Sequence, residues 1–433
     1  MKTVIRPETE MKDSGIEWIG DIPKDWNSAP IKVNFDIYAG ATPSSNNPIY
    51  WDGDIAWITP ADYKTEDKYV SCGKRHISQD GYDNCSAILV PANSIIFSKR
   101  APIGTVAISK NELCTNQGCL SCVSKDDSNI EFYYYAMSIA TEEFELKGSG
   151  TTFKEISLAN FKNFRFAVPP LSEQQAIADY LDETCSKIDE IIAEAKASID
   201  EYKELKQAVI DKAVLHGLCN GMMKDSGNDL IGKIPLSWEM RKLKYVADFN
   251  PGITTAYDAQ KEVGYVPMNC VKNGYMNPLS ARLSDMSTGL TGFQDGDIVI
   301  AKVTPCFENG NIAVAENLEQ GVAFGSSELF VIRTHSINRR FMLYYLQNSV
   351  FKNQCISTMT GTGGLKRVSG YFVNNAYITY PPENEQQVIV NYLDEAVKNM
   401  DSLITEKESL INDLEAYKKS LIFEVVTGKR MVV

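Results

Sequence analysis

The chain has 433 residues, of which 44% are hydrophobic and 10% are aromatic. This length exceeds what a single hydrophobic core serves and indicates two to four packed domains. No apolar run approaches the ~18 residues of a membrane helix, and the first ten residues lack the apolar centre of a signal peptide, so we expect a cytoplasmic protein. The ten cysteines are scattered, and the single C-x-x-C (Cys119 and Cys122) has no second pair and no nearby histidine. We therefore expect no metal site.

The net charge of −13 is concentrated in two segments. Residues 172–215 contain eleven acidic and five basic side chains, and residues 383–430 contain ten acidic and six basic ones. The rest of the chain is therefore close to neutral. Because phosphate binding depends on local basic groups, the total charge does not exclude a nucleic-acid partner.

An internal repeat organises the chain. Residues 173–183 read EQQAIADYLDE and residues 385–395 read EQQVIVNYLDE, with eight of eleven positions identical at an offset of 212. The same offset relates MKDSG at 11–15 to MKDSG at 223–227. The sequence thus predicts two copies of one unit, preceded by residues 1–10, which we expect to be an unpaired extension.

Residues 11–167 are rich in turn signals that separate short apolar runs of strand length. Examples are 55–59, 94–97 and 105–108, while residues 129–146 have helical character. Residues 223–380 repeat this plan, with runs at 296–301, 311–315 and 329–332. This pattern predicts a mixed α+β globule in each copy.

A long helix is predicted after each globule. Pro169-Pro170 precedes the first helix, and Ser172 with Gln175 has the spacing of a capping box. Neither Gly nor Pro follows until Gly217, which predicts a helix of about 44 residues and roughly 65 Å. The second helix follows Pro381-Pro382 in the same way.

Both helices carry apolar residues at seven-residue spacing, which is typical of a coiled coil. In the first helix the two predicted seam sets, widened by Ile192 and Ile199, are Ile177, Thr184, Ile191, Ser198 and Leu205, and Leu181, Ile188, Ala195, Tyr202 and Val209. In the second helix they are Ile389, Ala396, Leu403, Leu410 and Tyr417, and Leu393, Met400, Lys407, Leu414 and Leu421. Ordinary core helices could carry such stripes, but two unbroken ones favour an antiparallel pair about a pseudo-two-fold axis.

Several short motifs resemble those of one protein family. They are GATPS at 40–44, YWDG at 50–53, IAWI at 55–58, TNQG at 115–118, and the Pro-Pro…Glu-Gln-Gln start of each long helix. Together they are similar to the specificity subunit of a type I restriction-modification system, and the resemblance covers the chain from Met11 onward. The second globule departs from the first: it lacks the Tyr-Trp segment, and NPGI at 250–253 stands roughly where GATP stood.

The resemblance implies two target recognition domains, at residues 1–168 and 220–380, each followed by a long helix, at 169–219 and 381–433. Each domain would read one half of a bipartite, interrupted site in double-stranded DNA. Two methyltransferase subunits would dock on the helical rod, and motor-nuclease subunits would join for cleavage. The partner-binding residues expected on the helix starts are Gln174, Gln175, Tyr180, Gln386, Gln387 and Tyr392.

A search for chemistry within the chain gives no catalytic, cofactor or metal residue. Asn47-Pro48-Ile49-Tyr50 is superficially similar to the Asn-Pro-Pro-Tyr of amino methyltransferases, but it lacks the second proline and a preceding Gly-rich turn. There is no P-loop and no G-x-S-x-G. We therefore expect a non-enzymatic DNA-recognition subunit; the alternatives are a non-enzymatic coiled-coil scaffold and, with less support, a DNA methyltransferase in its own right.

Candidates for DNA contact are two Gly-rich loops, GSGTTFK at 148–154 and GTGGLKR at 361–367, that occupy the same place before each Pro-Pro. Glycines let backbone N–H groups approach phosphate, while Thr, Lys and Arg supply hydrogen bonds and charge. A plain surface turn is the alternative for these loops. Three further basic residues follow similar strands. The predicted DNA-binding residues are Lys99, Arg100, Thr151, Thr152, Lys154, Lys302, Thr362, Lys366 and Arg367.

Overall fold

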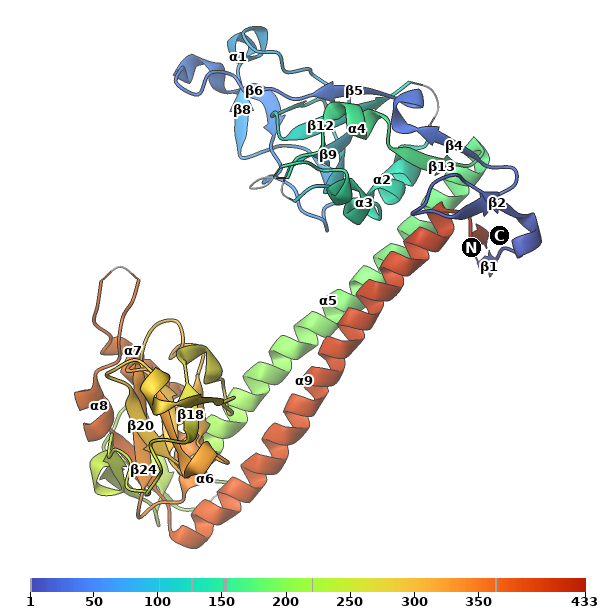
Figure 1. Ribbon diagram of the computed structural model, residues 1–433. Coiled ribbons are helices and arrows are strands. Elements are labelled where there is room, and N and C mark those ends of the chain that lie inside the picture. The colour runs from blue at the N-terminus through green and yellow to red at the C-terminus, as the bar shows by residue number, and fades with distance from the viewer. Residues whose placement is uncertain (1, 101, 126–127, 151–153, 220, 363) are drawn as a thin grey trace. The chain divides into compact units, whose positions relative to one another are not determined.

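The computed structural model describes residues 2–100, 102–125, 128–150, 154–219, 221–362 and 364–433 (Figure 1). It divides into two compact units. Unit 1 comprises Met1–Ala195 and Ser409–Val433, and unit 2 comprises Lys196–Glu408. Within the described ranges, every helix is too short or too polar to span a lipid bilayer.

Unit 1 is a mixed α+β fold, and its helices pack beside small antiparallel and mixed sheets. Its strands are β1 (Thr3–Ile5), β2 (Met11–Asp13), β3 (Asp21–Pro23), β4 (Asn27–Pro30), β5 (Phe35–Ala39), β6 (Trp51–Ile58), β7 (Tyr69–Val70), β8 (Arg75–Ile77), β9 (Ile95–Ser98), β10 (Val106–Ser109), β11 (Cys114–Thr115), β12 (Cys119–Ser124), β13 (Arg165–Val168) and β26 (Arg430–Val432). Its short helices are α1 (Gln79–Asp83), α2 (Ile130–Ser138), α3 (Thr141–Leu146) and α4 (Leu158–Lys162). The helical segment predicted at 129–146 is thus two helices.

Unit 2 repeats this fold with different details. Its strands are β14 (Met223–Asp225), β15 (Lys233–Pro235), β16 (Glu239–Lys242), β17 (Ala247–Phe249), β18 (Glu262–Val266), β19 (Leu279–Arg282), β20 (Thr291–Gln294), β21 (Ile298–Ala301), β22 (Ile312–Val314), β23 (Val322–Gly325), β24 (Leu329–Thr334) and β25 (Tyr377–Tyr380). Its short helices are α6 (Arg339–Gln347), α7 (Ser349–Ser357) and α8 (Gly370–Asn375).

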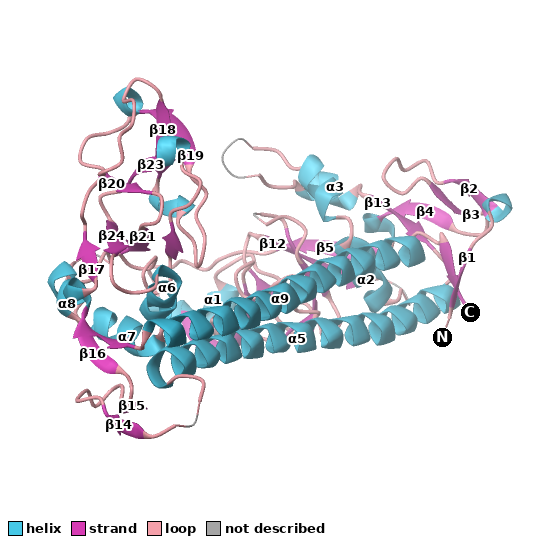
Figure 2. Ribbon diagram, turned by 90° about the horizontal axis from the view of Figure 1, so that it is seen from below, coloured by secondary structure: helices cyan, strands magenta, loops and turns pink. Residues whose placement is uncertain are grey.

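The sheet orders show the repeat directly. Unit 1 has the sheet β5-β12-β9-β10-β7, and unit 2 has the sheet β17-β24-β21-β22 in the same order with the same antiparallel pairs. A second sheet accompanies each one, β11-β6-β8 in unit 1 and β19-β18-β23-β20 in unit 2. Figure 2 shows the two sheets of unit 2 one beyond the other, with α6 on the side of β21. The second sheet is where the two units differ most.

Each core is built on the repeated residues. Trp26 and Trp238, which are equivalent in the repeat, are fully buried in the main core of their own unit. Each core also includes apolar residues of the central strands and of one face of the long helix, such as Leu181 in unit 1 and Leu393 in unit 2. Burying side chains of this size supplies the main stabilisation of each unit.

The long helices are α5 (Leu171–His216) and α9 (Glu383–Val426), and each unit contains part of both. In unit 1, Lys418 of α9 binds Asp189 of α5 at 2.6 Å. In unit 2, Lys206 of α5 binds Asp401 of α9 at 2.6 Å. In the same unit, Lys407 of α9 lies over the ring of Tyr202 of α5. From Tyr202 to Lys206 the residue numbers of α5 rise, while those of the contacted residues of α9 fall from 407 to 401. The helices are therefore antiparallel partners.

One predicted seam set is correct and the other is displaced by one residue. In α5 the buried positions after Ile177 include Leu181, Cys185, Ile188, Ile192, Ala195 and Ile199, whereas Ile191 and Leu205 are 46% and 51% exposed. In α9 the buried positions include Leu393, Met400, Ile404 and Ile411, whereas Leu403 and Leu410 are 38% and 45% exposed. At residues 191–192, 403–404 and 410–411 both adjacent positions are apolar, and only packing selects the buried one.

The start of α5 also differs from the prediction. The helix begins at Leu171, and the carbonyl of Pro170 accepts bonds from the N–H groups of Glu173 and Gln174. Ser172 therefore lies inside the first turn rather than at the cap. The side chain of Gln174 turns back to the carbonyl of Pro169 at 2.9 Å, which stabilises the helix start without a capping box.

The N-terminal residues are not an unpaired extension. Strand β1 pairs with β26, which follows α9, so that Thr3 lies opposite Val432. The guanidinium of Arg6 binds the carbonyl of Gly428 and the carboxylate of Glu173. The prediction was wrong because this pairing joins segments more than 400 residues apart, which no local pattern reveals.

Candidate functional site

Three strands of unit 1 meet at one edge of the main sheet. β5 ends, β12 begins and β9 ends there, since Leu120 pairs with Ala39 and Cys119 pairs with Ser98. The segments beyond these strand ends are residues 40–46, 115–118 and 99–100. Residues 148–150 and 154–156, in which Ser149 pairs with Glu155, lie beside residues 99–100, and we call them the hairpin of unit 1. We call this group of segments the hairpin edge of unit 1.

The loop at 40–46 and the turn at 115–118 form one surface at this edge. The N–H of Ala41 donates to the carbonyl of Thr115 at 2.9 Å, and the hydroxyl of Thr42 bonds the side-chain oxygen of Gln117. A Cβ on Gly40 would lie 2.1 Å from the carbonyl of Asn116, so only glycine fits there. The family-like motifs GATPS and TNQG therefore meet in space.

Two tryptophans hold the 40–46 loop from behind. The indole N–H of Trp57 donates to the carbonyl of Ala41 at 2.9 Å, and that of Trp51 donates to the carbonyl of Ser44 at 3.2 Å. The two indoles pack edge to face, with ring centroids 5.1 Å apart. This is the role of the Tyr-Trp and Ile-Ala-Trp-Ile motifs: they fix a polar, exposed loop.

The hairpin of unit 1 is joined to the strand end by backbone and ionic contacts. Glu155 pairs with Ser149 across the hairpin, and the N–H of Ile156 donates to the carbonyl of Lys99. The carboxylate of Glu155 accepts from the ammonium of Lys99 at 2.8 Å and from Nε of Arg100 at 2.9 Å. The hydrogen bond from Lys99 is the main cause of the lowered pKa of Glu155.

Unit 2 has the same edge, formed by segments 302–304 and 326–328 and by the hairpin residues 360–362 and 364–368. Ala301 at the end of β21 pairs with Leu329 at the start of β24. Arg367 pairs with Thr360 across the hairpin, and the N–H of Val368 donates to the carbonyl of Lys302 at 2.9 Å. We call these segments the hairpin edge of unit 2.

The charges of this second edge are arranged differently. The carboxylate of Glu328 accepts two hydrogen bonds from the guanidinium of Arg367, at 2.9 Å from Nε and 2.8 Å from Nη2, and lies 4.0 Å from the ammonium of Lys302. The pKa of Glu328 is lowered, chiefly by the hydrogen bonds from Arg367. Glu328 occupies the position of Gly118, because the N–H groups of Lys302 and Lys99 donate to their respective carbonyls.

The loop at 250–255 does not join the hairpin edge of unit 2. It leaves the sheet at Asn250, whose φ is 50°, and turns back toward β20. The backbone N–H and the hydroxyl of Thr254 both donate to the side-chain oxygen of Gln294, at 2.8 and 3.0 Å. Arg333, paired with the buried carboxylate of Asp297, holds the carbonyl of Gly252. NPGI at 250–253, which stands in the sequence roughly where GATP stands in the first copy, therefore does not take the place of the 40–46 loop at the hairpin edge.

Most of the predicted DNA-binding residues are brought together in two groups, one in each unit. Lys99 and Arg100 meet the first hairpin, while Lys302 meets the second hairpin, which carries Arg367. Lys154 and Lys366, which are equivalent in the repeat, are exposed, and no described residue forms an ion pair with either. Thr362 is exposed in the second hairpin, whereas Thr151 and Thr152 lie outside the described residues.

Sequence reasoning missed four side chains at these edges. They are Thr42, Gln117, Glu155 and Glu328. A signal for the first two was present in the sequence, because Thr42 and Gln117 are polar residues in the Gly-containing motifs GATPS and TNQG. These motifs served only to indicate the family. The two glutamates had no such signal, because their cation partners come from distant segments.

The glutamines at the helix starts connect each globule to its helix. The side-chain oxygen of Gln174 accepts the N–H of Asn129 at 3.1 Å, and that of Gln386 accepts the N–H of Asn338 at 2.7 Å. Gln174 and Gln386 are buried, with 5% and 2% exposure, so their side chains face the interior of the chain and not a partner. This corrects the partner-binding prediction for these two residues.

Three of the other four predicted partner residues are exposed. Gln175 and Gln387 are exposed, although their side-chain oxygens accept from the amides of Asn129 and Asn338. Tyr392 is 45% exposed, whereas Tyr180 is only 9% exposed and belongs to the core of unit 1.

A second anchor in each unit is the aspartate of the repeated YLDE. The hydroxyls of Tyr135 and Tyr344 donate to Asp182 and Asp394, each at 2.6 Å. A cation joins each pair, Lys68 in unit 1 and Arg340 in unit 2. Each globule is thus fixed to its helix by the same buried and half-buried groups.

Several exposed apolar residues of the long helices lie on one flank. They immediately precede one set of seam positions in both helices, and in an antiparallel pair such positions border the same side of the seam. In unit 1 this apolar flank contains Ile191, Leu410 and Tyr417; in unit 2 it contains Leu205 and Leu403. The aspartates that follow the other seam set, Asp189 and Asp401, form the ion pairs with Lys418 and Lys206.

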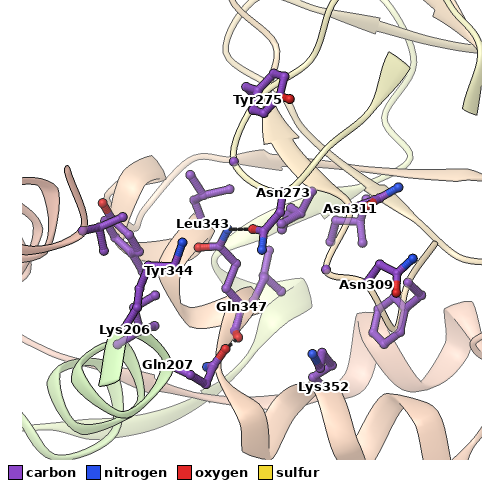
Figure 3. Close-up of a pocket in the computed structure, with 18 of the residues that line it drawn as sticks. Lys206, Gln207, Asn273, Tyr275, Asn309, Asn311, Leu343, Tyr344, Gln347 and Lys352 are labelled. Atoms are coloured by element: carbon purple, nitrogen blue, oxygen red, sulfur yellow. Dashed lines mark hydrogen bonds between the residues drawn. The ribbon is translucent and has the colours of Figure 1, made fainter. Parts of the chain in front are cut away.

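A cavity of about 260 Å³ lies in unit 2 between α5, α6, α7, α9 and the loops 273–275 and 307–311. Figure 3 shows Gln207, Gln347 and Asn273 linked by hydrogen bonds in its wall. Asn273, which lines the cavity, also pairs with Ile312 of β22 through an isolated parallel bridge. None of the segments of the hairpin edge lines it.

Two copies of one α+β domain, each with a differently composed polar edge on a shared scaffold, are the architecture of a two-module binding protein. The sequence profile of the family described as "Type I restriction modification DNA specificity domain" matches the chain twice, over residues 23–201 and 235–413. The chain belongs to this family. The suspected resemblance is therefore confirmed, and the chain has the role of a specificity subunit.

Individual relatives agree with this assignment. The chain is 28% identical over 451 residues to the type I restriction enzyme MjaIX specificity subunit of Methanocaldococcus jannaschii, covering 99% of this chain and 98% of that protein. It is 31% identical over 279 residues to the EcoAI specificity subunit of Escherichia coli, covering 63% of this chain and 45% of that protein.

Solved structures share the fold. A chain from a structure described as "Structural basis underlying complex assembly and conformational transition of the type I R-M system" aligns with a TM-score of 0.73 at 16% identity, covering 94% of this chain and 99% of that one. The HsdS subunit from Thermoanaerobacter tengcongensis aligns with a TM-score of 0.53 at 16% identity, covering 94% and 98%. The predicted fold class, two α+β globules with two long paired helices, is confirmed.

Proposed function

We propose that each hairpin edge reads one half of a bipartite, interrupted site in double-stranded DNA. The observation that carries this proposal is the recurrence of one sheet edge in both units with different side chains on it. A shared scaffold places the two edges alike, while their different side chains suit two different half-sequences. The domain boundaries that go with it are 1–168 and 220–380 for recognition, and 169–219 and 381–433 for the helices.

The chemistry of the edges supports contact with DNA. Lys154 and Lys366 are exposed, and within the described residues neither forms an ion pair, so both suit contact with phosphate. Phosphate contacts position a protein on the duplex without reading sequence. In unit 1 the hydroxyl of Thr42 and the carboxamide of Gln117 lie on the outer surface. Carboxamide and hydroxyl groups are among those that read base edges in the major groove.

The apolar flank supports docking of two methyltransferase subunits, one on each unit. Ile191 with Leu410 and Tyr417 in unit 1, and Leu205 with Leu403 in unit 2, expose apolar side chains at repeat-related positions. Patches of this kind on a helix pair suit a partner helix. Gln175, Gln387 and Tyr392 stay candidates for the same contact, and motor-nuclease subunits join the assembly for cleavage.

In this proposal the chain performs no catalytic step, and the methyl transfer and cleavage belong to its partners. The chain contributes the choice of sequence and the spacing between the two half-sites through its helices. Because the proposed ligand is DNA, the proposed location of the protein is the cytoplasm. Salt-dependent binding of duplex DNA distinguishes this function from that of a protein scaffold.

Exchange of one recognition domain tests the proposal. Residues 223–380 are replaced by the equivalent domain of a relative with another target, and the methylated motif is determined by methylome sequencing of a host that also makes the methyltransferase partner. We expect one half of the motif to change and the other half to stay the same. A matched exchange of residues 11–167 should change the opposite half; a motif that changes in both halves, or in neither, contradicts two-domain readout.

A further inference from the structure

Each hairpin edge contains a carboxylate held between two cations, but the two units build this group from different elements. In unit 1 the hairpin supplies the acid, Glu155, and the strand end supplies Lys99 and Arg100. In unit 2 the turn before β24 supplies the acid, Glu328, and the hairpin supplies Arg367. The strand end supplies Lys302, whose ammonium donates to the carbonyl of Ser327 at 2.7 Å and lies 4.0 Å from Glu328. The charge at the hairpin position is thus reversed between the units, yet the composition of the group is preserved.

The hairpins do not depend on these ion pairs for their path. Backbone pairing joins Ser149 to Glu155 and Thr360 to Arg367, and the strand ends are bound by the N–H groups of Ile156 and Val368. The side chains of Arg100 and Arg367 are 46% and 48% exposed, whereas those of Lys99 and Lys302 are 14% and 24% exposed. Ion pairs at the exposure of the two arginines contribute little to folding stability. Their recurrence therefore has another physical reason.

The carboxylate occupies the place that a phosphate would take. A carboxylate and a phosphate both accept paired hydrogen bonds from a guanidinium, and Glu328 accepts such a pair from Arg367. While the glutamate is bound, two of the cations at each edge are already neutralised in part. In unit 2 this leaves Lys366 as the hairpin cation that no described residue pairs.

We propose that Glu155 and Glu328 are specificity-determining positioning residues that limit binding to non-target DNA. Glu155 holds Lys99 and Arg100, and Glu328 holds Arg367 with Lys302 close by, away from the phosphates of a passing duplex. A matching half-site lets the hairpin edge approach closely enough for phosphate to share or displace the carboxylate. Non-target DNA gains only the weaker contact with the free lysine. This inference rests on the proposed function and names residues that set its discrimination.

The test compares isosteric variants in the full-length chain with its methyltransferase partner. Glu328→Gln and Glu155→Gln remove the negative charge and keep the shape, and the matched control is Glu262→Gln, an exposed carboxylate of unit 2 that binds the hydroxyl of Ser280. Affinity is measured by fluorescence anisotropy for a random-sequence duplex and for the target duplex, from 50 to 300 mM salt.

We expect Glu328→Gln and Glu155→Gln each to bind random duplex about tenfold more tightly at low salt, with a salt slope steeper by about one to two, because each freed cation displaces about one counterion. Affinity for the target should change less, so the ratio of target to random binding falls. Adding Arg367→Gln to Glu328→Gln should return the salt slope toward that of the unaltered protein. The Lys366→Gln variant should lower affinity for both duplexes.

The outcomes separate this inference from the function on which it depends. If the unaltered complex shows no salt-dependent duplex binding, the proposed function fails. If it binds, but Glu328→Gln and Glu155→Gln behave like Glu262→Gln, only the inference is overturned. Weaker binding of both duplexes, with an unchanged ratio, also overturns it, since that result would assign the glutamates to support of the hairpins alone.

Discussion

At the scale of single residues, the first glutamine of each repeated EQQ motif forms hydrogen bonds between a long helix and its globule. Gln174 accepts the N–H that begins α2 and donates to the carbonyl that precedes α5, at 3.1 and 2.9 Å. Gln386 makes the same two bonds in unit 2, at 2.7 and 2.8 Å. Each glutamine therefore ties the start of the long helix to the globule beside it.

Removal of one glutamine should loosen one unit. We expect Gln174→Ala to lower the free energy of unfolding of unit 1 by about 1–3 kcal/mol, because it leaves the N–H of Asn129 and the carbonyl of Pro169 unpaired in a buried place. The neighbouring exposed residue gives the control, and Gln175→Ala should stay within about 0.5 kcal/mol. Urea unfolding of the full chain measures both; equal effects of the two substitutions would contradict the assigned roles.

At the scale of elements, each long helix has a buried seam that stabilises the fold and an exposed apolar flank that we propose as a docking surface. The seam of α5 buries Cys185, Ile192 and Ile199, whereas Ile191 lies on the apolar flank. Adjacent residues of the same type thus face different surroundings: Ile192 is 7% exposed and Ile191 is 46% exposed. The same contrast recurs in α9 at Leu403 and Ile404.

This contrast gives a paired prediction. Ile192→Asn should destabilise unit 1 by about 2–5 kcal/mol, since it removes a packed side chain and buries an amide. Ile191→Asn should leave urea unfolding nearly unchanged and should weaken association with the methyltransferase partner, measured by analytical ultracentrifugation. Leu403→Asn and Ile404→Asn repeat the comparison in unit 2. Unaltered association in both flank variants would remove the apolar flank as the docking surface.

At the scale of the whole molecule, the two ends of the chain complete the first copy of the repeat. Gly217 and Gly428 both have a φ of 75° and end α5 and α9. After Gly217 the chain continues into the β14–β15 hairpin of unit 2, whereas after Gly428 it forms β26 and pairs with β1, which leads into the β2–β3 hairpin. In unit 1 the pairing of β1 with β26 thus links the end of a long helix to the following hairpin, a link that the continuous chain provides in unit 2.

We expect the helices to set the gap between the two half-sites. Insertion of seven residues near Ile199 of α5 and seven near Ile411 of α9 keeps the heptad seam and adds roughly 10 Å, close to three base pairs. The methylated motif should keep both half-sequences and gain a longer non-specific gap, as read by methylome sequencing.

Insertions of four residues are the comparison, because they slip the seam and should cost stability. A folded, active seven-residue variant that keeps the original gap would limit the helices to a docking role.

The sequence by itself determined the features that repeat or have a local period. The 212-residue offset gave the two copies, the absence of Gly and Pro gave the long helices, and the set with Leu181 and Ile188 gave one line of the seam. The Gly-rich loops with Lys154 and Lys366 marked the right segments of the hairpin edges, and their contact with DNA stays a prediction. All of these depend on residues close together in the chain.

The tertiary structure alone decided the partners. Ile191 and Ile192 differ only in which neighbour packs on them, which a repeating apolar pattern leaves open. Arg367 meets Glu328, 39 residues earlier, and Lys99 meets Glu155, 56 residues later, because strand order brings those segments to one sheet edge. The pairing of β1 with β26 joins the chain ends for the same reason. Sheet pairing and side-chain packing are non-local, so no short pattern specifies them.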